Sequence, residues 1–428
     1  MADLLIKNAR LAGSGARVDV RISGERIARV EPAGTLKAAE AGAEVVDARG
    51  NLLTPPLIDS HVHLDTALTA GEPRYNASGT LFEGIAVWSE RKKDLTRADV
   101  KERARTALQW EVSQGVGFVR THVDVCDPEL TALQALLELK EEVAPWVKLE
   151  IVAFPQEGVL AYEGGRDLLE EALRLGADCV GGIPHYELTR EDGVASIEII
   201  FRLAEKYDRK VDIHCDEIDD EQSRFLESVA AQAIRSGLGP RVTASHTTAM
   251  GSYNGAYSYK LTGFLRRAGL NIVANPLVNL NLQGRFDAYP KRRGLTQVKE
   301  LLAAGVNVSF GHDDILDPWY PLGRGSLLQV AHMGVHACQL SGRQELYEAF
   351  AMVSERAART LALGADYGLA PGRPADLVLW AAPDEVTALR LEATALLVLH
   401  RGQVVARTTP GRTTFAGGGV TEDITFQF

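Results

Sequence analysis

Apolar runs rich in β-branched residues alternate with amphipathic segments along the middle of this chain. A short apolar run of this kind predicts a buried strand, and apolar residues spaced three to four apart predict a helix packed on one face. The eight runs with the character of strands lie at 52–58, 117–123, 148–154, 179–184, 210–213, 241–245, 271–274 and 306–310. Helical patterns occupy 97–113, 129–143, 195–207, 221–235 and 296–304, the first of them preceded by a capping-box pair, Thr96 and Asp99.

Eight strand runs that alternate with helices predict an α/β fold, a parallel (β/α)8 barrel of the TIM type, which occupies about 250 residues. The competing fold is an open doubly wound sheet, which needs a glycine-rich turn after its first strand. The first run here is followed by Asp-Ser-His-Val-His at 59–63, which favours the barrel.

Both ends of the chain have a different pattern, made of short strands that alternate apolar and polar residues. The strand-like segments lie at 4–6, 18–22, 27–30, 375–380 and 395–398, with Arg401 and Gly402 at a hairpin turn. We therefore expect the two termini to form one small β-sandwich domain from residues 1–55 and 371–428, and residues 56–370 to form the catalytic barrel.

The composition narrows the class of protein. The 428 residues carry 57 Asp and Glu against 46 Lys and Arg, a formal net charge of −11 that disfavours binding to nucleic acid or to an anionic membrane. The 4 cysteines are widely spaced and form no CxxC pair, which is typical of a reducing compartment. The sequence begins without the apolar core of a signal peptide and has no long uncharged apolar run, so we expect a cytoplasmic protein without a membrane partner.

The histidines are in phase with the predicted strands. Of the 10 histidines, seven follow a strand run: His61, His63, His122, His185, His214, His246 and His312. The carboxyl ends of barrel strands meet at one mouth, where enzymes of this fold place their active sites. The sequence therefore predicts a cluster of imidazoles at the mouth of the barrel.

A metal site is the simplest chemistry for this cluster. His61 and His63 are two residues apart on a strand, so both rings point to the same side, and two neutral imidazoles can bind one divalent cation. His214 and Asp313 follow the fifth and eighth runs and would complete a set of three histidines and one aspartate. Taken singly, His214 could instead be a core histidine bonded to backbone, and Asp313 could cap the next helix.

Longer motifs surround these residues, at 55–63, 154–158, 183–185, 214–217, 245–250, 275–279, 311–314 and 317–320. Together they resemble the amidohydrolase superfamily, and within it the bacterial cytosine deaminases. The HxH pair alone would specify only the superfamily. Gln156, the spacing of His214 and Glu217, and the stretch from Asp313 to Trp319 are similar to the deaminase branch.

The resemblance implies one divalent metal ion, Fe²⁺ or Zn²⁺ with Mn²⁺ as an alternative, held by His61, His63, His214 and Asp313. Asp313 would act in catalysis as well, and His246 would orient or deprotonate water without being a ligand. A second metal in this superfamily needs a bridging lysine or glutamate at a middle strand, and no lysine ends the third or fourth run. The resemblance therefore implies a single metal.

Glu217 and three further side chains complete the predicted site. The resemblance implies that Glu217 carries the water proton to the substrate, although an acid here would also favour the first turn of the next helix. Gln156 offers a donor and an acceptor to the amide-like edge of a ring. Asp314 is expected beside the exocyclic amine, and Trp319 either covers the ring or packs as a core aromatic.

The predicted function is hydrolytic deamination of a free nucleobase, with cytosine and water giving uracil and ammonia. Alternatives with the same chemistry are isocytosine, 5-methylcytosine, isoguanine, creatinine or a triazine, and more distant ones are a cyclic-amide hydrolase or a non-catalytic metal-binding barrel. His185 and Glu187 spell the HxE of polynucleotide deaminases, but the sequence lacks the PCxxC that those enzymes need. We expect a small-molecule substrate, no nucleic-acid partner and, by resemblance, a homo-oligomer.

Overall fold

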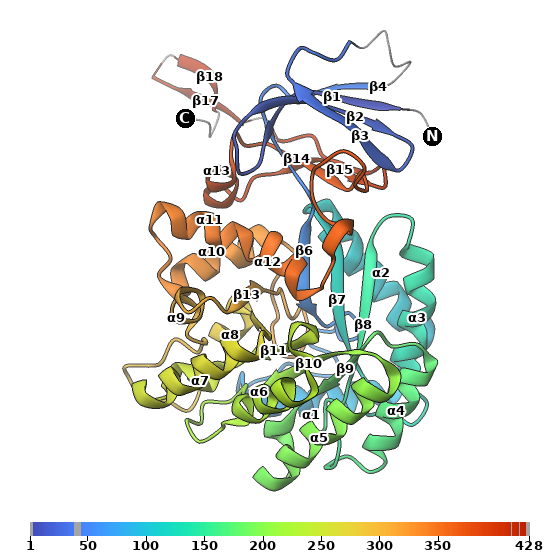
Figure 1. Ribbon diagram of the computed structural model, residues 1–428, viewed down its shortest axis with the longest axis vertical. Helices are drawn as coiled ribbons and strands as arrows, with labels where there is room; N and C mark the ends of the chain where they lie inside the picture. The colour runs from blue at the N-terminus through green and yellow to red at the C-terminus, as the bar shows by residue number, and fades with distance from the viewer. Residues whose placement is uncertain (1–2, 38–43, 412, 419, 425–428) are drawn as a thin grey trace. The chain divides into compact units, whose positions relative to one another are not determined.

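Figure 1 shows a computed structural model of the chain, which describes residues 3–37, 44–411, 413–418 and 420–424. The chain divides into two compact units. One unit consists of Ile58–Glu111 and Phe118–Leu363, and the other of Met1–Leu57, Val112–Gly117 and Gly364–Phe428. The second unit is therefore assembled from both ends of the chain and a short internal segment.

The first unit is built on eight parallel strands that follow one another in chain order around a nearly closed barrel. They are β6 (Leu57–Val62), β7 (Val116–Asp124), β8 (Lys148–Phe154), β9 (Cys179–Gly182), β10 (Lys210–Cys215), β11 (Val242–His246), β12 (Asn271–Ala274) and β13 (Asn307–Phe310). A parallel bridge between Val62 and Asp313 joins the end of β6 to the segment after β13. The predicted (β/α)8 barrel is confirmed.

Helices follow most of the strands and pack on their outer side (Figure 1). For example, α3 and α4 contact β8, α5 contacts β9, and α6 contacts β11. The helices of this unit include α1 (Leu81–Arg91), α2 (Arg97–Ser113), α3 (Thr131–Val143), α4 (Gly165–Leu175), α5 (Arg190–Tyr207), α6 (Phe225–Ser236), α7 (Gly255–Ala268), α8 (Pro276–Leu282), α9 (Val298–Ala303), α10 (Leu327–Cys338), α11 (Arg343–Ala351) and α12 (Glu355–Thr360). α2 begins as the sequence predicts, because the Thr96 hydroxyl accepts a hydrogen bond from the N–H of Asp99 at 3.2 Å.

The first of the eight predicted strands is wrong in its bounds. It is two strands, β5 (Leu52–Thr54) and β6 (Leu57–Val62), which belong to different sheets. Pro55 and Pro56 lie between them, and proline has no backbone N–H for a sheet ladder. The barrel strand therefore begins later than predicted and carries His61 within it rather than after it.

Four of the five predicted helices begin at other residues than the sequence predicts: α3 and α9 begin two residues later, and α5 and α6 differ by more. α5 begins at Arg190 because Thr189 caps it, with its hydroxyl accepting from the N–H of Asp192 at 3.1 Å. α6 begins at Phe225, where the Asp216 carboxylate accepts from the backbone N–H at 2.9 Å. Local capping by side chains thus decides both starts.

The second unit contains a sheet to which both termini contribute. Its strand order is β16-β15-β14-β5-β1-β2-β3, with β4 paired to β1, and β17 and β18 form a separate ribbon. The strands besides β5 are β1 (Leu4–Leu11), β2 (Arg17–Ser23), β3 (Arg26–Pro32), β4 (Glu44–Asp47), β14 (Leu377–Trp380), β15 (Ala395–His400), β16 (Gln403–Arg407), β17 (Thr413–Gly417) and β18 (Val420–Ile424), with helix α13 (Glu385–Arg390) between β14 and β15. Side chains from both ends, including Ile6, Val20, Leu377 and Leu397, share one apolar core.

One group of buried charges in the barrel unit consists of paired residues. Arg120 on β7 is 1% exposed and contacts Glu150 at 2.8 Å and Asp212 at 2.9 Å. Lys210 contacts Glu150 at 2.5 Å. Removing one member of such a group leaves the other charges buried without compensation.

We predict that Arg120→Met lowers the free energy of unfolding by about 3–5 kcal/mol, because the buried Asp212 loses its arginine and Glu150 keeps only Lys210. Urea denaturation followed by circular dichroism measures the change. The control is Arg174→Met, since the Arg174 side chain is 54% exposed and pairs with Glu170 and Glu171 at the surface. Its loss is expected to cost about 1 kcal/mol or less, and equal losses for the two variants would contradict the prediction.

Candidate active site

The barrel closes at the residues that the sequence predicts to bind metal. The backbone N–H of Asp313 donates to the carbonyl of His61 at 2.7 Å, and the carbonyl of Asp313 accepts from the N–H of His63 at 2.8 Å. Asp313 has a φ of 72°, in the left-handed region that few non-glycine residues adopt. Closure of the barrel therefore fixes the HxH segment and Asp313 relative to one another.

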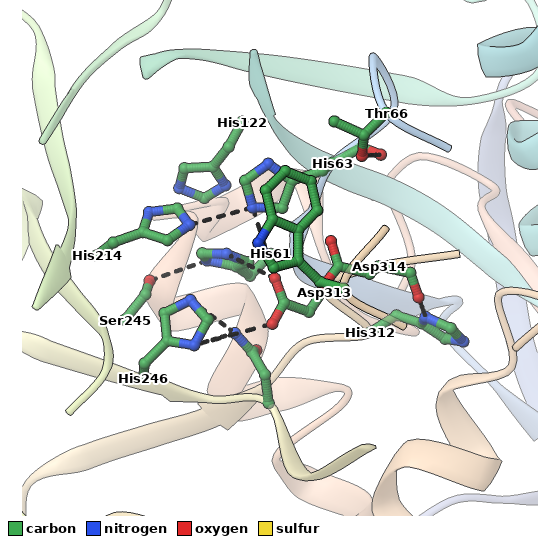
Figure 2. A network of polar contacts seen from close by, with 12 residues as sticks. His61, His63, Thr66, His122, His214, Ser245, His246, His312, Asp313 and Asp314 are labelled. Atoms are coloured by element: carbon green, nitrogen blue, oxygen red, sulfur yellow. Dashed lines mark hydrogen bonds and ion pairs between the residues drawn. The ribbon is translucent and has the colours of Figure 1, made fainter. Parts of the chain in front are cut away.

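The imidazoles and the carboxylate converge in a small volume (Figure 2). His63 Nε2 lies 3.1 Å from His214 Nε2 and 3.5 Å from Asp313 Oδ1. His61 Nε2 lies 3.3 Å from the same carboxylate oxygen. All four side chains are buried. The four residues predicted as metal ligands are therefore neighbours in space.

Several side-chain nitrogen and oxygen atoms of this cluster have no hydrogen-bond partner in the part of the chain that the structure describes. They include His61 Nε2 and Asp313 Oδ2. Burying a polar atom without a partner costs about 1–3 kcal/mol, and more for a charged group. A divalent cation bound to these lone pairs would supply the missing partner, so the residues present fit a metal ion.

The donor atoms can be grouped in more than one way around an ion. His61, His214, His246 and Asp313 offer atoms that all lie within 4.8 Å of one another. His63 belongs to two overlapping groups, one with His61 and His122 and one with Asp313 and Asp314. The structure thus adds His122, His246 and Asp314 to the possible metal donors that the sequence predicts.

Burial sets the charge states of these groups. It lowers the pKa of His61, His63 and His214 well below the usual histidine value, and neighbouring imidazoles lower it further. These rings are therefore neutral near pH 7, as metal ligands must be. Burial raises the pKa of Asp313 well above its usual range. Burial would lower the pKa of His246 too, but the carboxylates of Glu217 and Asp313 outweigh it and raise that pKa.

A small cavity lies directly against this cluster. Its lining combines polar groups with three apolar side chains: His63, Leu81, Gln156, His214, Glu217, His246, Leu282, Asp313, Asp314 and Trp319. All the side chains predicted to act in catalysis or to contact substrate are among them. Leu81 and Leu282 were not predicted, because an isolated leucine carries no chemical signal in a sequence.

Glu217 differs from the other acids of its loop. Its Oε1 lies 3.1 Å from His246 Nδ1. Asp216 instead accepts hydrogen bonds from backbone at the start of α6, and Asp219 accepts from the N–H of Gly284 at 2.7 Å. Of the acids at 216, 217, 219, 220 and 221, Glu217 is the one that lines the cavity.

Trp319 lines the cavity, and Gly84 leaves room for its ring. Its indole Nε1 donates to the carbonyl of Leu81 at 3.2 Å, and a Cβ on Gly84 would lie only 2.4 Å from the indole Cδ1. Asp317 accepts from the N–H of Trp319 at 2.9 Å and from the Thr66 hydroxyl at 2.8 Å. Trp319 is 5% exposed and lines the cavity, and its contact with a substrate ring stays a prediction.

Gln156 and the HxE segment are linked through one loop. Gln156 follows β8 and is buried in the cavity wall. The Glu187 carboxylate accepts from the N–H of Val159 at 2.7 Å and from that of Ala161 at 2.8 Å. Glu187 therefore holds the loop after Gln156, which gives the HxE segment a structural role.

A parallel eight-stranded barrel with imidazoles and a carboxylate gathered at its strand ends is typical of hydrolases that bind metal. Residues 44–406 match the amidohydrolase family designated Amidohydro_3. The chain belongs to the amidohydrolase family, and it is a hydrolase that acts on C–N bonds.

Relatives of known structure or curated name share most of the chain. The structure of 5-methylcytosine deaminase from Klebsiella pneumoniae liganded with 5-fluorocytosine superposes with a TM-score of 0.93 at 47% identity, covering 96% of this chain and 99% of that one. N-isopropylammelide isopropyl amidohydrolase from Pseudomonas sp. (strain ADP) is 28% identical over 95% of this chain and 97% of its own length. Pterin deaminase from Rhizobium rhizogenes is 29% identical over 92% of this chain and 89% of its own length.

Among the described residues, no helix combines the length and the apolar character that crossing a membrane requires.

We predict that Zn²⁺ raises the thermal midpoint of chelator-stripped protein by roughly 5–10 °C. An ion present at about 100 times its Kd stabilises the folded state by about 2.7 kcal/mol, and each kcal/mol shifts the midpoint of a domain this large by about 2–4 °C. Differential scanning fluorimetry measures the shift. His214→Ala should abolish it, whereas His336→Ala, an exposed position on α10, should keep it. A shift that survives in His214→Ala would contradict a metal at this cluster.

Proposed function

We propose that this hydrolase deaminates a cytosine-type pyrimidine, replacing the exocyclic amine by oxygen and releasing ammonia. The observation that carries the proposal is the cavity itself. Residues that fit a metal ion, Glu217 and the side chains proposed to bind the ring all line it. The sequence predicts cytosine first and names 5-methylcytosine as an alternative. The relative at 47% identity favours 5-methylcytosine, and the walls formed by Leu81, Leu282 and Trp319 are apolar enough to accept a methyl group.

The proposed metal ligands are His61, His63, His214 and Asp313. The geometry supports His63 over His246 as the fourth ligand, because His63 Nε2 faces both His214 and Asp313 (Figure 2). His246 Nδ1 is already in contact with Glu217 Oε1, and with the side-chain amide of Asn279 at 2.9 Å. When bound, a divalent ion lowers the pKa of water to about 7 and so makes water a nucleophile at neutral pH. Fe²⁺, Zn²⁺ and Mn²⁺ all suit this donor set.

Glu217 is the proposed acid and base. Its carboxylate is buried in the wall of the cavity that would hold the substrate. It would accept the proton of the attacking water, deliver it to ring N3, and then help to protonate the departing amine. His246, which contacts Glu217 and lies 3.8 Å from Asp313 Oδ2, would orient that water.

The remaining polar side chains are proposed to select the ring. Gln156 can donate to the ring carbonyl and accept from a ring N–H. A substrate without that edge would leave the buried amide of Gln156 unpaired. Burial and the neighbouring carboxyl of Asp317 raise the pKa of Asp314 well above its usual range, so Asp314 can be a neutral hydrogen-bond donor or acceptor near the amine. Trp319 would cover the ring face.

The cavity also bears on the partners that the sequence predicts. A small cavity lined by buried side chains suits a free base better than a base within a polynucleotide. We therefore propose a small-molecule substrate and no nucleic-acid partner. The homo-oligomer and the cytoplasmic location stay predictions.

We predict that Glu217→Gln lowers kcat for ammonia release by about 10²–10⁴, because the amide cannot carry the proton. Ammonia is measured enzymatically after reconstitution with Zn²⁺, with cytosine and 5-methylcytosine assayed side by side. Glu221→Gln is the matched control, since Glu221 is an exposed acid of the same loop.

The assay tests the deamination activity and the choice between the two bases separately. Ammonia release from either pyrimidine that Glu217→Gln loses and Glu221→Gln keeps would support it, and a preference of roughly tenfold for the 5-methyl base would rank the two substrates as proposed. A metal-loaded wild-type protein that releases no ammonia from either base would refute the pyrimidine substrate.

A further inference from the structure

A chain of buried hydrogen bonds leads away from one predicted metal ligand into the barrel. His61 Nδ1 lies 3.0 Å from the hydroxyl of Ser245, and that hydroxyl donates to Asp212 Oδ1 at 2.7 Å. The three side chains come from β6, β11 and β10, and all are fully buried. Figure 2 shows the contact between Ser245 and His61 on the side of the ring away from Asp313.

The direction of these hydrogen bonds follows from the groups beside them. Arg120 Nη1 lies 2.9 Å from Asp212 Oδ2, and an arginine side chain is always a cation. Asp212 is therefore held as an acceptor, and the single hydroxyl proton of Ser245 points to it. The hydroxyl oxygen must then accept from His61, which places the ring proton on Nδ1.

This arrangement leaves the lone pair of His61 on Nε2. That atom faces Asp313 Oδ1 at 3.3 Å and has no hydrogen-bond partner among the described residues. We infer that Ser245 and Asp212 are positioning residues that fix the tautomer and the direction of His61 for metal binding. The inference rests on the metal site of the proposed function.

The other histidines around the proposed metal site are oriented by different contacts, so they do not duplicate the role of Ser245. His214 stacks on Phe154 with ring centroids 3.9 Å apart and planes at 17°, and its Nδ1 has no hydrogen-bond partner among the described residues. His122 packs on the face of His61 at a centroid distance of 3.9 Å, which restricts the plane of that ring but does not choose its tautomer. Ser245 supplies the hydrogen bond that makes the choice.

Groups that orient a metal ligand through its second nitrogen typically contribute 10- to 100-fold to metal affinity. Ser245→Ala removes the acceptor for Nδ1–H and leaves His61 free to place its proton on either nitrogen. Ser245→Thr keeps the hydroxyl. Ser60→Ala is the matched control, because Ser60 precedes His61 on β6, is fully buried, and donates its hydroxyl proton to the carbonyl of Phe310 at 2.9 Å.

The experiment measures Zn²⁺ affinity of the full-length apoproteins by competition with a chromophoric chelator. Ser245→Ala should bind Zn²⁺ about 10- to 100-fold more weakly than wild type. Ser245→Thr and Ser60→Ala should stay near the wild-type affinity. A second readout is the ¹⁵N ring shifts of histidine-labelled apoprotein, with the His61 signals identified by their loss in His61→Asn. We expect Nδ1–H in wild type and a mixture of tautomers in Ser245→Ala.

The possible results test the role of Ser245 and the existence of the metal site separately. Equal affinities for Ser245→Ala and Ser60→Ala, together with an unchanged His61 tautomer, would overturn the inference while leaving the metal site in place. If Ser245→Ala or Ser245→Thr does not fold, the wild-type tautomer decides, because a proton on Nε2 would overturn the inference by itself. A wild-type protein that binds no Zn²⁺ would instead refute the metal site on which the inference rests.

Discussion

The structure depends on buried lone pairs that have no hydrogen-bond partner among the described residues. His61, His63, His214 and Asp313 are buried within a few ångströms of one another, and the atoms without such a partner include His61 Nε2 and Asp313 Oδ2. Such a cluster is unfavourable by itself, since buried polar atoms cost free energy unless they are paired. A bound cation would pair these atoms and so offset the cost of burying them. This would explain why so many polar groups lie at one point of the barrel.

The backbone of the barrel makes this concentration possible. The strands are parallel, so side chains at their carboxyl ends meet without long loops. The closing bridge between Val62 and Asp313 joins a ligand strand to the residue that faces it. The loops then add the chemistry, with Glu217 after β10 and Gln156 after β8. Hydrogen bonds to the carboxylates of Asp216 and Glu187 hold the backbone of these loops.

Much of the fold and site could be predicted because the signals are local. β8 (Lys148–Phe154) and β12 (Asn271–Ala274) have the bounds that the sequence predicts, and strand-end histidines mark the mouth. The predicted bounds of the first barrel strand are wrong, because the apolar run at 52–58 also includes β5 of the other sheet. Pro55 and Pro56 separate β5 from the barrel strand β6. Leu81 and Leu282 could not be predicted as cavity walls, since apolar residues look alike in a sequence. The contact of Ser245 with His61 depends on the register of strands 184 residues apart.

The most direct test of this account is the position of the ion in a crystal of the protein grown with Zn²⁺, found from anomalous scattering at the zinc edge. One strong peak is expected, bonded to His61, His63, His214 and Asp313, with His246 beside it and in contact with Glu217. A peak bonded to His246 in place of His63 would contradict the assigned ligands. No peak in the cavity would contradict the central claim that the unpaired atoms form a metal site.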